Sequence, residues 1–240
     1  SQQHYSEKII YMPDSYQVNV SQRSVSEISI SRLDLGLPEK GFVFCSFNNA
    51  YKITPSTFAL WMRILKIVND SVLWLLVSND ETAKNLTKEA EKSGINKNRL
   101  VFAKYVPVEE HLNRIKHADL FVDNLPCNAH TTTSDALRMG LPVLTCVGKS
   151  FASRVAASLI NAVGLPELIT TTQQEYEVLA VELATNPKKL KAIKDKLAHN
   201  LPSAPLYDTP LFTRHLESAY KVMYERYHEG LEPDHIYVER

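Results

Sequence analysis

Apolar residues along the chain fall into two kinds of segment that alternate. Short runs rich in β-branched and aromatic residues, with little polar alternation, are typical of strands buried on both faces. They cover residues 42–47, 72–77, 100–103, 120–123 and 142–146. Longer segments with apolar residues at helical spacing cover residues 55–68, 81–93, 107–117, 131–139 and 150–163. Strands and helices that alternate over short connections predict an α/β fold with a doubly wound, Rossmann-like parallel sheet.

The same pattern divides the chain into three parts. Residues 1–34 are largely polar, lack periodicity from residue 13 onward, and are interpreted as a connector. Residues 35–200 contain the predicted sheet, and after Leu168 their pattern is purely helical. Residues 201–240 begin with a proline-containing loop and continue with a helical pattern over 211–228, which predicts a helical C-terminal extension.

Composition narrows the class of protein. Hydrophobic residues make up 44% of the chain, which is enough for a core, and 27 basic against 27 acidic residues gives no basic surface of the kind that nucleic acid requires. No apolar run approaches the roughly 18 residues of a membrane span, and no secretory leader is recognisable. The three cysteines form no C-x-x-C pair. We therefore expect a cytoplasmic protein with neither nucleic acid nor membrane as partner.

The glycines exclude two familiar phosphate loops. With only 7 glycines, the chain contains neither the dinucleotide fingerprint G-x-G-x-x-G nor a P-loop, which disfavours a dinucleotide-dependent enzyme. It also lacks Asp-x-Asp, H-E-x-x-H and G-x-S-x-G motifs. If a diphosphate binds here, we expect its charge to be neutralised without a metal ion.

Polar residues follow the predicted strands at the edge where such sheets bind ligands. Lys52 follows the first strand, and a helix is predicted to begin after His130 with Thr131 and Thr132. The free N–H groups and dipole of a helix start attract anions, and Asp135, one turn on, is suited to sugar hydroxyls. The alternatives are an ordinary surface lysine and a helix whose threonines merely cap it.

A second group follows the strand 100–103. The Val106-Pro107 turn offers backbone groups to the edge of a base, and His111 and Arg114 share one helix face. Their planar side chains are suited to stacking on a base. The alternative is a solvated helix face. Because all these residues lie at one edge of one sheet, together they favour a phosphate-bearing ligand.

These residues belong to longer stretches that resemble the carboxyl-terminal catalytic half of the O-GlcNAc transferase family. The N-A-Y-K-I and H-T-T-x-x-D-A-L motifs carry the resemblance most specifically. It extends over nearly the whole chain, through residues 5–19, 44–57, 71–76, 106–137 and 151–169. The family implies a GT-B glycosyltransferase in which this half is the nucleotide-sugar lobe, residues 1–34 include the end of the preceding lobe, and tetratricopeptide repeats usually stand upstream.

The resemblance also implies roles for the phosphate-side residues. Lys52 would be catalytic, because it would stabilise the diphosphate that leaves. His130, Thr131 and Thr132 would hold phosphate, and Asp135 would bind the ribose hydroxyls. Val106, Pro107, His111 and Arg114 would form the uracil and ribose pocket, and Asn49 would join the donor-binding set.

The implied activity is inverting transfer of N-acetylglucosamine from UDP-GlcNAc to protein Ser or Thr hydroxyls, with no cofactor. The chain departs from the animal enzymes at Asn49, Val108 and Ala129, where those have glutamine, lysine and glycine. GDP-fucose therefore remains an alternative donor, and a noncatalytic scaffold module is an alternative class. Acceptor proteins and the general base would depend on the missing lobe, so we expect this chain alone to bind donor without transferring sugar.

Overall fold

A computed structural model describes residues 5–240. Within them, six parallel strands form one sheet in the order β4-β3-β2-β5-β6-β7. These strands are β2 (Phe42–Ser46), β3 (Ser71–Leu76), β4 (Leu100–Ala103), β5 (Leu120–Val122), β6 (Val143–Cys146) and β7 (Ile169–Thr170). The predicted α/β fold with a parallel sheet is confirmed.

The order of the strands creates a switch point. From β2 the chain moves outward through β3 to β4, and then returns to place β5 on the other side of β2. The connections at the carboxyl ends of β2 and β5 therefore diverge, and ligands of such sheets bind in the crevice between them. The polar loops singled out in the sequence follow these two strands.

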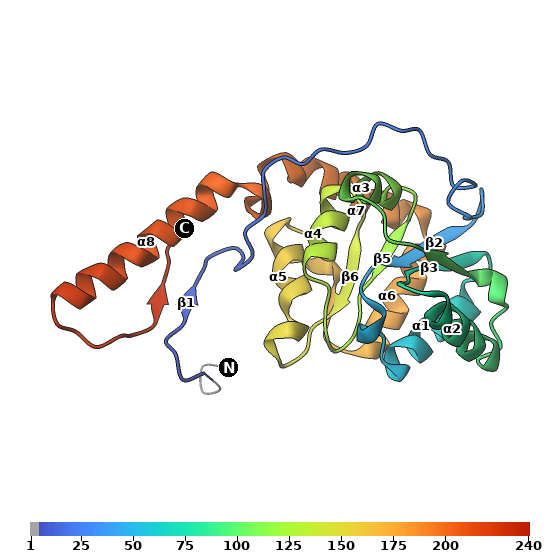
Figure 1. Ribbon diagram of the computed structural model, residues 1–240, viewed down its shortest axis with the longest axis horizontal. Coiled ribbons are helices and arrows are strands. Elements are labelled where there is room, and N and C mark those ends of the chain that lie inside the picture. Colours follow the sequence, from blue (N-terminus) through green and yellow to red (C-terminus); the bar gives the residue numbers. More distant parts are fainter. Residues whose placement is uncertain (1–4) are drawn as a thin grey trace.

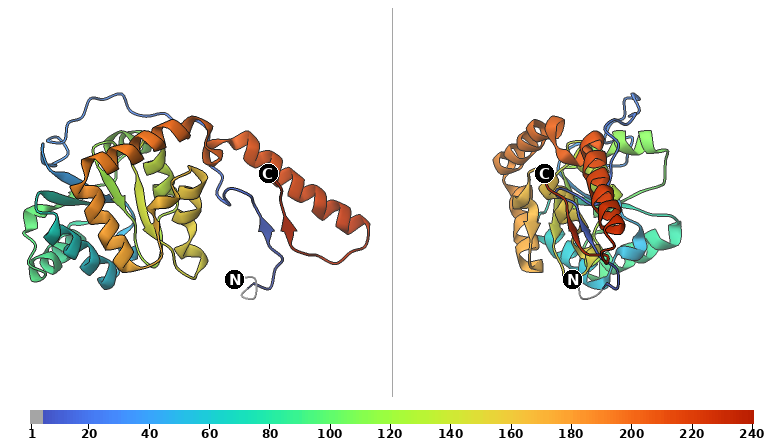
Figure 2. Two further views of the ribbon diagram at one scale, coloured as in Figure 1. Left: turned by 180° about the vertical axis from the view of Figure 1, so that it is seen from behind. Right: turned by 90° about the vertical axis from the view of Figure 1, so that its left-hand side faces the viewer.

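Helices cover both faces of the sheet (Figures 1 and 2). On one face α3, α4 and α5 pack side by side, and on the other α6 packs between α1 and α7. The helices of the domain are α1 (Pro55–Ile67), α2 (Asp80–Lys92), α3 (Val108–Ile115), α4 (Thr131–Arg138), α5 (Val155–Ala162), α6 (Gln173–Thr185) and α7 (Pro187–Asn200).

Capping residues explain where two of the helices begin. The Thr54 side chain accepts a hydrogen bond from the N–H of Thr57, and Pro55 occupies the first turn of α1. At the start of α7, the side-chain oxygen of Asn186 likewise accepts a hydrogen bond from the N–H of Lys189. Both caps satisfy N–H groups that a helix leaves unpaired, and both helices begin where the sequence predicts.

One expectation about the sheet is wrong. The chain is not purely helical after Leu168, because β7 pairs with β6 as a sixth strand. With two residues, β7 is too short to produce an apolar run that a pattern detects. The helix expected over residues 150–163 is also divided, since Phe151–Ser153 form a 3-10 turn before α5 starts.

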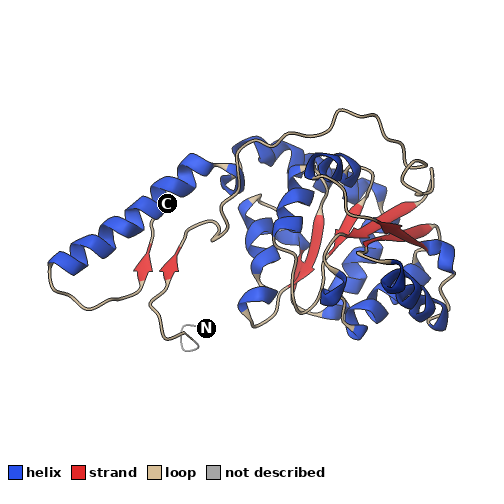
Figure 3. Cartoon of the chain, in the orientation of Figure 1, coloured by secondary structure: helices blue, strands red, loops and turns tan. Residues whose placement is uncertain are grey.

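The two terminal segments form an arm that projects from the sheet domain (Figures 1 and 3). It consists of α8 (Thr209–His228) and a two-stranded parallel ribbon of β1 (Ile10–Tyr11) and β8 (Ile236–Tyr237). The Tyr11 and Tyr237 rings stack with centroids 4.6 Å apart. The helical extension is confirmed, whereas the ribbon was missed because each strand has two residues and its partner lies at the opposite end of the sequence.

The connector between β1 and β2 follows the surface of the sheet domain. Arg32 forms an ion pair with Asp119, with 2.9 Å between Nη2 and Oδ2. The Ser26 N–H donates to the Glu109 carbonyl at 3.1 Å, and the connector thus reaches α3 as well. These contacts bind the segment to the domain along its length.

Gly41, directly before β2, offers a test of how closely the backbone packs at the start of this central strand. Its φ is +104°, and a Cβ there would lie 2.4 Å from the Asp70 carbonyl oxygen, whereas Gly230, with φ +68°, has nothing within 4 Å. We expect Gly230→Ala to lower the free energy of unfolding by about 1 kcal/mol through positive φ alone. Gly41→Ala should lower it by roughly 1–3 kcal/mol more, because the clash is with backbone. Equal losses in urea unfolding would contradict this.

Candidate functional site

The loops that follow β2 and β5 are joined by a buried amide network at the switch point. The Ser46 hydroxyl and the Asn48 amide both donate to Asn124 Oδ1, each at 2.8 Å. The Thr132 hydroxyl at the start of α4 donates to Asn48 Oδ1 at 2.9 Å. The two loops and the helix start are therefore held in a fixed relation to one another.

Lys52 crosses from the first loop to the second. Its Nζ donates to the Asn128 carbonyl at 2.9 Å. The residue ends a 3-10 turn, Ala50–Lys52, which Asn49 caps. Asn49 itself is exposed. The structure thus places the cation predicted from the sequence beside the chain that leads into α4.

The start of α4 presents unpaired backbone donors. The N–H groups of Thr133 and Ser134 bond to the His130 carbonyl, so the amides of Thr131 and Thr132 are the ones that helix geometry leaves without an internal partner. Thr131 is exposed and Thr132 partly so. With the helix dipole, these amides and hydroxyls form a surface that is suited to an anion and requires no glycine.

His130 stands at this helix start as a neutral group. Burial lowers its pKa, and the nearby Lys52 charge lowers it further. Nδ1 lies 3.3 Å from the Tyr16 hydroxyl, and a hydrogen bond with the Ala152 backbone opposes the lowering of the pKa. The imidazole therefore adds no charge to the site at pH 7.

Asp123, directly after β5, holds the loop that leads to α4 through hydrogen bonds. Its Oδ1 accepts from the N–H groups of Asn124 and Ala129 at 2.8 and 2.7 Å, and its Oδ2 accepts from the Thr145 hydroxyl at 2.6 Å. Burial raises the pKa of this fully buried carboxyl to about 7, against the opposing hydrogen bonds. Sequence reasoning used Asp123 only as a strand end, yet it fixes both ends of the loop before α4.

The second predicted group assembles around a buried ring that the sequence did not single out. Arg114 Nε donates to His111 Nδ1 at 3.1 Å, and Nη1 donates to the Lys104 carbonyl at 2.7 Å. The guanidinium lies 5.4 Å from the centroid of Phe47, and the His111 ring meets Phe47 edge-on at 5.2 Å. Burial and then Arg114 lower the pKa of His111 to about 4, which leaves it neutral.

Exposed apolar groups lie next to this cluster. Tyr105, Val106 and Val108 are exposed, and Pro107 caps α3 without a side-chain hydrogen bond. Exposed apolar surface beside polar edges is suited to a flat heterocycle. All predicted residues of this group, Val106, Pro107, His111 and Arg114, thus occur around the carboxyl end of β4.

Asp135 is not free. Its Oδ1 pairs with Arg23 Nη1 at 2.9 Å, and its side chain is only 9% exposed. Burial raises the pKa of Asp135, whereas Arg23 and then Arg138 lower it. Arg23 lies in the segment interpreted as a connector, where nothing in the pattern marked it.

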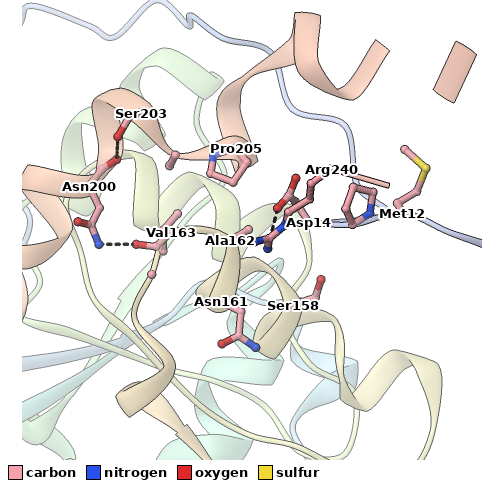
Figure 4. A pocket seen from close by; sticks show the side chains of 13 residues that line it. Met12, Asp14, Ser158, Asn161, Ala162, Val163, Asn200, Ser203, Pro205 and Arg240 are labelled. Atoms are coloured by element: carbon pink, nitrogen blue, oxygen red, sulfur yellow. Dashed lines mark hydrogen bonds and ion pairs between the residues drawn. The ribbon is translucent and has the colours of Figure 1, made fainter. Parts of the chain in front are cut away.

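A hollow in the surface lies apart from these residues (Figure 4). Its volume is about 610 Å³, and the Asp14–Arg240 ion pair, at 3.2 Å, crosses its rim. Its lining includes Met12, Asp14, Ser158, Asn161, Asn200 and Arg240. None of the predicted donor residues lines this hollow, which is therefore distinct from the candidate site.

Three further observations concern metal binding, membrane spans and the cysteines. Among residues 5–240, no group of three His, Cys, Asp or Glu side chains is placed to hold a metal ion, and a metal-free site stays a prediction. No helix in that range is long and apolar enough to cross a bilayer. Cys45, Cys127 and Cys146 are all free thiols.

Sequence comparison shows the family. The profile of glycosyl transferase family 41 matches residues 20–216. A UDP-N-acetylglucosamine–peptide N-acetylglucosaminyltransferase of Caenorhabditis elegans is 38% identical over 211 residues, 88% of this chain and 18% of that protein. An Arabidopsis thaliana protein named "Probable UDP-N-acetylglucosamine–peptide N-acetylglucosaminyltransferase SEC" is 35% identical over 240 residues, 98% of this chain and 25% of that protein.

Solved structures agree with the fold. A mutant O-GlcNAc transferase of Thermobaculum terrenum matches with a TM-score of 0.74 at 29% identity, covering 88% of this chain and 39% of that chain. Anabaena HepE in complex with UDP and glucose matches with a TM-score of 0.59 at 13% identity, covering 80% and 51%. The second likeness concerns the fold alone.

The fold defines the class first: this is an α/β lobe of the GT-B type, with polar loops gathered at the switch point of its sheet. The chain belongs to glycosyl transferase family 41. The resemblance drawn from its motifs is thereby confirmed. The chain spans 18% and 25% of the length of the two curated relatives named above.

The raised pKa of Asp123 has a measurable effect on stability. With a pKa of about 7 in the native protein against roughly 3.9 in an unfolded chain, the native state keeps a proton that the unfolded state releases. The free energy of unfolding should therefore fall between about pH 4 and pH 7, by up to about 1.4 kcal/mol per pH unit from this group. We expect Asp123→Asn to remove that component.

Urea titrations from pH 4 to pH 8 measure the contribution of Asp123 as the difference in free energy of unfolding between the native protein and the Asp123→Asn variant. Asp34→Asn serves as the control, because hydrogen bonds from the Ser31 side chain and N–H lower the pKa of Asp34. The stability that Asp34 contributes is lost only as the pH falls below this range, so the control variant should keep the native pH dependence from pH 4 to pH 8. An Asp123→Asn variant with the native pH dependence would contradict the assignment.

Proposed function

We propose that this chain is the donor-binding part of an inverting protein O-glycosyltransferase whose donor is UDP-N-acetylglucosamine. The observation that carries the proposal is the position of Lys52 beside the start of α4, at the switch point of the sheet. The printed names of the Caenorhabditis elegans and Arabidopsis thaliana relatives support the choice of donor.

The donor's diphosphate would bind at the start of α4. Lys52 supplies a full positive charge, and the Thr131 and Thr132 amides supply oriented donors at the positive end of the helix dipole. The neutral imidazole of His130 offers one further hydrogen bond. This arrangement is suited to one diphosphate without requiring a basic surface.

The nucleoside would bind toward β4. The Val106-Pro107 turn would present backbone groups to the uracil edge, with the His111–Arg114 cluster behind it. Asp135 would accept hydrogen bonds from ribose hydroxyls, and Asn49, exposed beside Lys52, would complete the donor-binding set.

In the proposed reaction an acceptor Ser or Thr oxygen attacks the anomeric carbon as the bond to the diphosphate oxygen breaks, which inverts that carbon. Negative charge grows on the leaving diphosphate, where Lys52 and the α4 amides stabilise it. Loss of one such contact typically costs about 3 kcal/mol in the barrier. The acceptor proton passes to a general base that we place outside this chain. We place acceptor binding outside this chain as well. The whole protein would be cytoplasmic.

The role of Lys52 is tested by the affinity for UDP. We expect Lys52→Ala to weaken UDP binding about tenfold or more in calorimetry, because a charge-assisted contact is lost. Lys88→Ala, which removes an exposed lysine on α2, should leave the affinity unchanged. If Lys52→Ala binds UDP as the native chain does, Lys52 lies outside the donor site.

The choice of donor is tested by thermal shift. A ligand that binds only the native state raises the melting temperature, so we expect UDP and UDP-N-acetylglucosamine to raise it more than GDP and GDP-fucose, with or without magnesium. Preference for GDP-fucose would instead indicate a fucosyltransferase. No shift with any nucleotide would indicate a noncatalytic module, and a shift that needs magnesium would contradict the metal-free site.

A further inference from the structure

Residues 16–23 form a strap that lies along α4 on the way from the arm to the sheet domain (Figure 1). Three strap side chains each reach a different polar residue at or near the start of the helix. Tyr16 reaches His130, and Asn19 Oδ1 accepts from the Ser134 hydroxyl at 2.6 Å. Arg23 pairs with Asp135.

The strap is also held from the other side. Arg138 at the end of α4 donates to the carbonyls of Val20 and Ser21. The Thr209 hydroxyl at the start of α8 donates to the Asn19 carbonyl at 2.9 Å. With anchors on two helices, the strap has a defined position that does not depend on Arg23 alone.

The Arg23–Asp135 pair acts on a carboxylate that is otherwise poorly placed to stay ionised. Burial raises the pKa of Asp135, and the charges that lower it are Arg23 first and Arg138 second. Tyr207, which packs on Arg138 with 4.2 Å between guanidinium carbon and ring centroid, is the other titratable group on this side. Among the described residues the ion pair engages Oδ1, and Oδ2 has no hydrogen bond.

We propose that Arg23 is a positioning residue of the donor site, which orients the Asp135 carboxylate so that Oδ2 accepts a hydroxyl of the donor's ribose. The proposal rests on the function proposed above. It assigns to the strap a part in nucleoside recognition, although the strap lies more than a hundred positions from α4 in sequence.

A guanidinium is suited to this role because it keeps its charge and donates a charge-assisted hydrogen bond to Oδ1, which leaves Oδ2 available. Without Arg23, Asp135 keeps its place on α4 but loses both its main counter-charge and the contact that sets its orientation. The resulting loss concerns hydrogen bonds to ribose hydroxyls and leaves the diphosphate contacts of Lys52 intact. A purely structural contact would weaken all ligands alike.

The test compares two ligands that differ only in the ribose. Calorimetry on the 240-residue chain would use UDP and 2′,3′-dideoxyuridine diphosphate, which lacks both ribose hydroxyls. We expect the native chain to bind UDP about tenfold more tightly, as for a hydrogen bond to a charged group. Arg23→Ala should lose most of this preference while its affinity for the dideoxy ligand stays native, and Arg23→Lys should recover part of it.

Two further variants separate orientation from folding. Asn19→Ala removes a strap contact without touching the ion pair and should keep the native preference. Asp135→Asn should lose the preference, and the double variant Arg23→Ala/Asp135→Asn should lose no more, because the two act as one unit. Melting temperatures confirm that each variant is folded.

The possible outcomes distinguish a failure of the role proposed for Arg23 from a failure of the proposed function. A native chain that does not bind UDP would overturn the proposed function. A native chain that prefers UDP, with a folded Arg23→Ala or Arg23→Lys that keeps the full preference, would overturn only the role of Arg23. Equal weakening of both ligands in Arg23→Ala would do the same, since it would show a structural contact.

Discussion

The geometry of the candidate site depends on the Asp123 carboxyl group, which water does not reach. Asp123 holds the N–H groups of Asn124 and Ala129 with one oxygen, and these residues are the two ends of the loop between β5 and α4. A buried charge is unfavourable unless hydrogen bonds compensate it, and here three donors do so in part. The direction in which α4 points its first amides is thus set from inside the core.

The distribution of charge around the site follows from burial as well. Burial lowers the pKa of His111 and of His130, so both rings are neutral at pH 7. At the start of α4 the positive charge therefore comes from Lys52 and the helix terminus, whereas Arg114 lies in the separate cluster near β4. The proposed diphosphate site is compatible with a formal net charge of 0 and only 7 glycines, because it needs one lysine and one helix terminus rather than a basic surface or a glycine loop.

The sequence predicted those parts of the molecule whose cause is local. β2 and β3 lie in the apolar runs 42–47 and 72–77, and α1 carries its own cap at Thr54. The switch-point rule joined Lys52 to the loop before α4. The sequence did not predict β7, whose two residues leave no periodicity. Long-range pairs also escaped it: Arg23 reaches Asp135 over 112 positions, and Phe47 was counted as part of a strand although two site residues pack on its ring.

The ribbon of β1 and β8 has a mechanical consequence for the strap. Only four residues separate Tyr11, at the end of β1, from Tyr16, which touches His130. Such a short tether has little slack, so a rotation of the arm relative to the sheet would be transmitted to Tyr16. The arm is thereby coupled mechanically to the start of α4.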